Sequence, residues 1–120
     1  MTAPLEIFLV RKNGSDDTIF ITPVVDSFKV MYTDTRCKTT HFFYANESEV
    51  MRYVEDLFYL LTNDSDPFHA IQFSFPCFPS VMFKIAEFNT VAVRKTIQDR
   101  LYDTLVNWPE KFRSASLGIF

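Results

Sequence analysis

The spacing of apolar side chains is the feature that most constrains this chain, because it changes from a period of two to a helical period near residue 46. Apolar and β-branched residues are concentrated in short runs at 5–12, 18–22, 27–33 and 38–44. In the third run Phe28, Val30 and Tyr32 alternate with polar or longer side chains, as in a strand that is buried on one face. Four consecutive strands, joined by polar turns, are therefore predicted.

The rest of the chain alternates between helical and strand patterns. Apolar residues at three- and four-residue intervals predict helices over 47–61 and 89–107, and Asn46 followed by Glu49 has the spacing of a capping box. Runs at 69–75 and 80–85 predict two more strands. The order is ββββ-α-ββ-α, which favours an α+β fold: a two-layer sandwich of a mainly antiparallel sheet with two amphipathic helices on one face.

One domain is expected, over residues 1–109, followed by a C-terminal tail over 110–120. Pro109 ends the second helical pattern, and the residues after it carry no helical periodicity. A length of 120 residues with 48% hydrophobic content suits a single packed core.

Charge and composition exclude several classes of partner. Twelve basic and fifteen acidic residues give a formal charge of −3 with no basic run, so nucleic acid is not expected as a partner. Two glycines leave no glycine-rich phosphate loop, and no nucleotide or other cofactor is predicted. Residues 1–10 lack a secretory signal, and no apolar run of about eighteen residues predicts a membrane span. We therefore expect an intracellular protein with free thiols and no membrane insertion.

Metal and catalytic chemistry find little support in the residue spacing. Cys37, His41, His69 and Cys77 are the only cysteines and histidines, and none stands in the short Cys-x-x-Cys loop typical of zinc sites, so no metal is predicted. Cys77 or Ser80 with His69 would supply the ingredients of a hydrolase, but no nucleophile-elbow motif accompanies them. An enzyme is not expected, although this hydrolase remains an alternative.

Apolar side chains exceed what two helices on one face of a sheet can cover. Phe8, Val10, Phe20 and Phe43 are predicted to form a patch on the sheet that binds a partner. Four apolar residues of the tail form a second candidate for docking: Phe112, Leu117, Ile119 and Phe120. The alternative is that loops or the tail fold over the patch and bury it within the chain.

Three segments carry a resemblance to a group of known proteins. They are Asp66-Pro67-Phe68 through Ile71-Gln72-Phe73, then Pro76-Cys77-Phe78-Pro79-Ser80-Val81, and finally Asn107-Trp108-Pro109. Together they resemble small structural or accessory proteins of large eukaryotic DNA viruses, over less than half of the chain. The resemblance implies a minor virion component or a virus-encoded adaptor, and it carries over no site residue.

These observations predict a non-enzymatic module for protein–protein interaction or for a structural role in a larger assembly. Its partner would be another protein or a second copy of the chain. Two alternatives stay open: the hydrolase that uses Cys77, Ser80 and His69, and a carrier of small apolar ligands with an aromatic cavity between the sheet and the helices.

Overall fold

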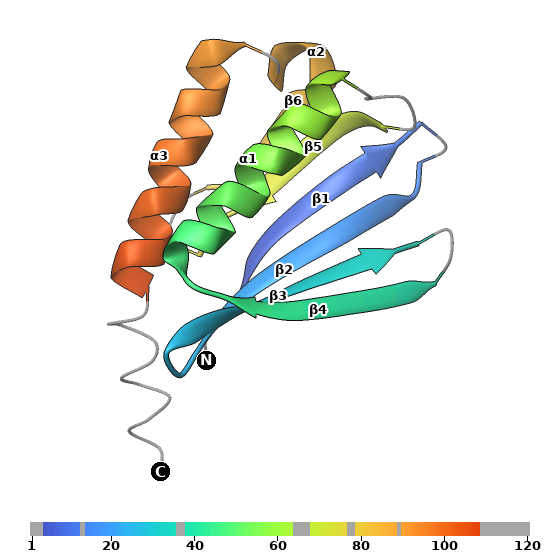
Figure 1. The fold of residues 1–120 in the computed structure, drawn as a ribbon. Coiled ribbons are helices and arrows are strands. Elements are labelled where there is room, and N and C mark those ends of the chain that lie inside the picture. The colour runs from blue at the N-terminus through green and yellow to red at the C-terminus, as the bar shows by residue number, and fades with distance from the viewer. Residues whose placement is uncertain are drawn as a thin grey trace.

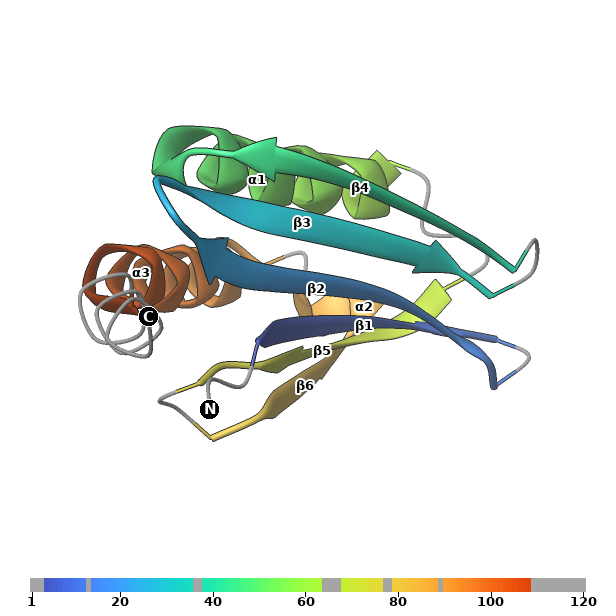
Figure 2. The ribbon, with the colours of Figure 1, turned by 90° about the horizontal axis from the view of Figure 1, so that it is seen from below.

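The computed structural model describes residues 4–12, 14–35, 38–63, 68–76, 79–88 and 90–108. Figure 1 shows how the elements are arranged, and Figure 2 shows the sheet with β4 crossing in front of α1. The elements are β1 (Leu5–Arg11), β2 (Asp16–Val24), β3 (Ser27–Asp34), β4 (Thr39–Ala45), α1 (Glu47–Asn63), β5 (Phe68–Ser74), β6 (Val81–Lys84), α2 (Ile85–Phe88) and α3 (Val91–Trp108).

The strands form one open sheet of six strands in the order β4-β3-β2-β1-β5-β6, with β4 and β6 at its edges. Every pair of neighbouring strands is antiparallel. The pairing of β1 with β5 joins the four N-terminal strands to the two that follow α1. This sheet with its two long helices confirms the predicted α+β class.

Helix α1 begins at a reciprocal cap, as the spacing of Asn46 and Glu49 predicts. The Glu49 amide donates to Asn46 Oδ1 at 2.9 Å, and the Asn46 amide donates to Glu49 Oε1 at 3.0 Å. Both bonds satisfy amides that would otherwise lack a partner in the first turn. The helix then buries a stripe at helical spacing, made of Val50, Val54, Leu57 and Leu61.

The core is one cluster of buried residues from the strands, α1 and α3, and the two long helices run antiparallel side by side (Figure 1). Strand residues at alternate positions enter it, beginning with Leu5, Ile7 and Leu9 of β1. Ile97 and Leu101 of α3 join the same cluster. Each of β1, β2 and β3 thus buries alternate side chains, which lie on one side of the sheet.

Two local features differ from the sequence prediction. Strand β2 continues through Pro23 to Val24, beyond the strand predicted over 18–22. Because β1 begins opposite Ile21, no strand among the described residues lies beside Pro23 on that side to lose a hydrogen bond. The strand predicted over 80–85 ends at Lys84, and Ile85 begins the four-residue helix α2, which is too short to produce a helical period in the sequence.

Candidate functional site

The side of the sheet away from the core carries a continuous row of large apolar side chains. Phe20 of β2 is paired with Met31 of β3, and Met31 is paired in turn with Phe42 of β4. Side chains that are paired across antiparallel strands lie on the same face, about 4.5–5.5 Å apart at Cβ. Phe8 and Tyr44 lie on the same face at diagonal positions. These five residues are called the open-face patch below: Phe8, Phe20, Met31, Phe42 and Tyr44.

The edge of the open-face patch is well exposed. Phe42 and Tyr44 on β4 are 57% and 59% exposed, and Met82 on β6 is 60% exposed on the same side of the sheet. The rings of Phe42 and Tyr44 meet edge to face with centroids 6.0 Å apart. Lys29 Nζ lies 4.7 Å from the centroid of Phe42, which puts a cation beside the aromatic pair.

The structure brings together three of the four sheet residues predicted for a binding patch. Phe8, Val10 and Phe20 share the open side of the sheet and are half-buried there. Phe43 lies on the opposite side, so its predicted place in the patch is corrected: it is paired with the core residue Val30, and its ring lies 5.3 Å from that of Tyr53 on α1. Adjacent strand residues point to opposite faces, so Phe42 takes the position expected for Phe43.

Sequence reasoning missed Met31, Phe42, Tyr44 and Met82 as members of the open side. The alternation within β4 was visible in the sequence, but the register of β4 against β3 was needed to assign its faces. The four tail residues predicted for docking lie outside the described residues: Phe112, Leu117, Ile119 and Phe120.

The described part of the hydrolase alternative does not assemble. The Ser80 hydroxyl donates to Ser74 Oγ at 3.2 Å, which places Ser80 near the last residue of β5. His69 is the second residue of that strand and is exposed, and at the usual rise per strand residue it lies about 16 Å from Ser74. Cys37 and Cys77 lie outside the described residues, and the described ranges contain no group of three or more potential metal ligands.

A buried cluster of charges on the core side was not predicted. Arg11 at the end of β1 and Asp17 near the start of β2 are 4% and 0% exposed. Arg11 donates through Nε to Asp17 Oδ1 at 3.0 Å and through Nη2 to Oδ2 at 2.5 Å. The Tyr32 hydroxyl also donates to Asp17 Oδ2, at 2.6 Å, and the Thr35 amide donates to Oδ1 at 3.3 Å. The carboxylate therefore has four donors in a site that excludes water.

These contacts fix the protonation states of the cluster. Burial would raise the pKa of Asp17, but the hydrogen bonds from Arg11, Tyr32 and Thr35 outweigh it, and the pKa lies below its ordinary value. The hydrogen bond with Asp17 raises the pKa of Arg11. Burial, followed by the bond to Asp17, raises the pKa of Tyr32 far above its usual value. At neutral pH the cluster is thus an ion pair with a neutral tyrosine.

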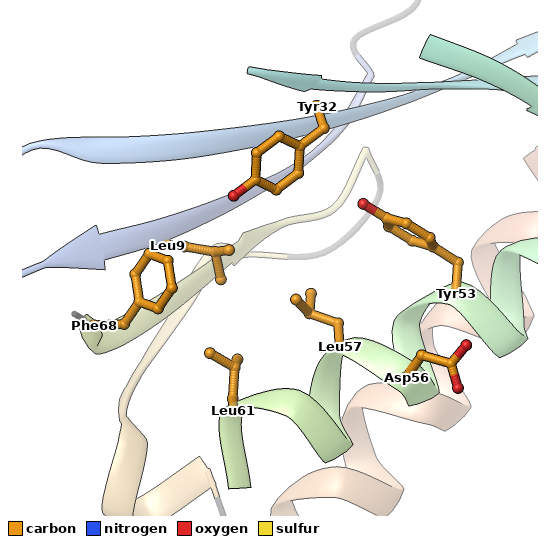
Figure 3. A pocket seen from close by; sticks show the side chains of 7 residues that line it. All are labelled: Leu9, Tyr32, Tyr53, Asp56, Leu57, Leu61 and Phe68. Carbon is orange, nitrogen blue, oxygen red and sulfur yellow. The ribbon is translucent and has the colours of Figure 1, made fainter. Parts of the chain in front are cut away.

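A pocket of about 300 Å³ lies next to this cluster, between α1 and the sheet (Figure 3). Tyr32 enters it from β3 and Tyr53 from α1, and leucines and Phe68 complete an apolar wall. The carboxylate of Asp56 points away from the pocket in Figure 3. The full lining of the pocket is Leu9, Tyr32, Tyr53, Asp56, Leu57, Leu61 and Phe68.

Within the described ranges, no helix is both long and apolar enough to cross a bilayer. The chain was also compared with models of protein families, with curated proteins and with solved structures. None of the three comparisons returned a match to it.

Proposed function

We propose that this protein is a non-enzymatic interaction module that associates with a second copy of itself through the open-face patch. The observation that carries the proposal is the exposure of Phe42 and Tyr44 on β4. Phe42 ends a row of paired side chains that begins with Phe20 and continues through Met31. Large aromatic and methionine side chains in contact with water are unfavourable by about 25 cal/mol per Å² of apolar surface. Such residues are enriched at the centres of protein interfaces.

A two-layer arrangement is part of the proposal: both long helices cover one face of the sheet, and the partner covers the other. Edge strand β4 supports it, because all of its residues from Thr39 to Tyr44 are exposed. A partner that covers β4 also protects an edge that would otherwise be open to aggregation. The same surface suits a structural role in a larger assembly, including the virion that the sequence resemblance implies.

Charge placement favours a second copy as the partner. Glu6, paired with Phe20, lies at one end of the open-face patch, and Lys29, paired with Tyr44, lies at the other. A two-fold axis through the patch places Glu6 of each copy near Lys29 of the other. Self-complementary surfaces of this kind are required for a two-fold dimer.

Sedimentation velocity over a range of protein concentrations tests the proposal. We expect a reversible dimer whose dissociation constant rises about tenfold or more in Phe42→Ser, because large aromatic side chains that become buried in an interface are frequent hot spots. Tyr102→Ser is the matched control, since Tyr102 on α3 is also 57% exposed but lies on another element. A wild-type protein that stays monomeric at every concentration, or equal weakening by both substitutions, contradicts the proposal.

Charge exchange tests the arrangement of the dimer. Glu6→Lys and Lys29→Glu should each weaken the dimer, and the double variant E6K/K29E should restore it. Failure of the double variant to recover affinity argues against the two-fold arrangement.

A further inference from the structure

We propose that the pocket between α1 and the sheet binds a small neutral aromatic alcohol or phenol. The inference concerns the core side of the sheet and is independent of the open-face patch. It rests on three properties of the pocket: its size, its lack of an available charge, and the pairing of one hydrogen-bond donor with one acceptor.

The size of the pocket suits one aromatic ring. Its volume of about 300 Å³ is at the lower end of the range for small-molecule sites. A dry apolar cavity of about 150 Å³ is large enough for benzene, so a ring with a short substituent fits here. Phe68, Tyr32 and Tyr53 enter the wall as rings, which favours an aromatic ligand through edge and face contacts.

The charged groups beside the pocket are either paired or directed away from it, so a charged ligand finds no counter-ion inside it. Arg11 lies on the ring of Phe68, 4.8 Å from its centroid, and its guanidinium is paired with Asp17. The carboxylate of Asp56 points out of the pocket (Figure 3). Burial raises the pKa of Tyr53, so that side chain stays neutral as well. An ion in this apolar space would lose its hydration without compensation.

The two tyrosines offer complementary hydrogen-bonding groups. Tyr32 donates its hydroxyl hydrogen to Asp17, so its oxygen remains available toward the pocket only as an acceptor. Tyr53 is in ring contact with Phe43, but its hydroxyl has no hydrogen-bond partner among the residues that the structure describes. Figure 3 shows the hydroxyl end of Tyr53 directed from α1 toward the sheet. One donor and one acceptor match a ligand hydroxyl, which both accepts and donates.

Titration of the full chain with para-propylphenol, followed by amide proton–nitrogen correlation spectra, tests the proposal. We expect saturable shifts at residues around the pocket. Propylbenzene should bind more weakly because it lacks the hydroxyl, and para-propylbenzoate and para-propylbenzylammonium should bind more weakly still. No saturable shift with para-propylphenol, shifts confined to other surfaces, or equal binding of either charged probe overturns the proposal.

The variant Tyr53→Phe tests the role of the hydroxyl, since it keeps the ring and removes one oxygen. Affinity for para-propylphenol should fall by about twofold to tenfold, as for the loss of one hydrogen bond, while affinity for propylbenzene stays unchanged. Tyr102→Phe makes the same change on an exposed position of α3 and should leave both affinities unchanged. Equal weakening of both probes in Tyr53→Phe overturns the assignment of Tyr53 as donor.

Discussion

Arg11 and Asp17 form a doubly hydrogen-bonded ion pair that is almost completely shielded from water. The two residues belong to neighbouring strands, β1 and β2, and both point to the core side of the sheet. Removing two charges from water is costly, and the pair persists only because its remaining hydrogen-bonding capacity is satisfied. Tyr32 and the Thr35 amide supply these bonds to Asp17. The closed end of the β1–β2 hairpin is therefore held to β3 by polar contacts.

Asp17→Asn should strongly reduce the free energy of unfolding. The substitution removes the hydrogen-bonded counter-ion of buried Arg11 and leaves only Asp34, whose Oδ1 lies 3.8 Å from Arg11 Nη2, so the expected loss is about 3–5 kcal/mol. Urea denaturation followed by circular dichroism measures it. The control is Asp16→Asn, which removes a carboxylate from the exposed neighbouring residue. A loss in Asp17→Asn no larger than in Asp16→Asn contradicts this account of the cluster.

The stabilisation from Asp17 should disappear in acid. Its pKa in the folded protein lies below the ordinary value of about 3.9, so the carboxylate favours folding above that pH. This contribution is lost as the pH falls through the folded pKa, where Asp17 becomes protonated. Urea midpoints measured between about pH 7 and about pH 2 should show the difference between wild type and Asp17→Asn shrinking with acidity. A difference that is constant with pH assigns the effect to something other than ionisation.

Asn46→Ala should lower the free energy of unfolding by about 1 kcal/mol, because it removes the side chain that accepts from the Glu49 amide at the start of α1. Ser48→Ala, an exposed position in the first turn of the same helix, serves as the control and should have little effect. Thermal unfolding of both variants provides the measurement. Equal stability of the two variants would show that the reciprocal cap contributes nothing.

The sequence was sufficient to predict most elements, because apolar periodicity and caps act over a few residues. The order of strands was not predictable, since β1 is paired with β5 from across α1 and no local pattern encodes that contact. The buried ion pair was missed because Asp17 fell outside the strand predicted over 18–22, in the polar turn before it. The sequence nevertheless contained an indication of this pair. Arg11 stands two residues after the buried Leu9, and Asp17 stands two residues before the buried Ile19, so each charge continues the buried face of its strand. Opposite charges that continue the buried faces of two neighbouring strands predict a buried ion pair.

Neighbouring residues Phe42 and Phe43 should respond oppositely to substitution by alanine. Phe43 is 40% exposed and packs against Tyr53, so Phe43→Ala should cost about 1–2 kcal/mol of folding stability, less than the ~3–5 kcal/mol of a fully buried phenylalanine. Phe42 is 57% exposed on the open side, and Phe42→Ala should change stability by no more than about 0.5 kcal/mol.

Urea denaturation of the two variants, at a protein concentration where the wild type is monomeric, compares their stabilities, and sedimentation at higher concentration compares their association. Phe42→Ala should weaken the dimer while Phe43→Ala leaves its dissociation constant close to that of the wild type, because only Phe42 belongs to the open-face patch. The reverse result, with Phe42 governing stability and Phe43 governing association, requires β4 to be shifted by one residue against β3, since a one-residue shift exchanges the two faces of a strand.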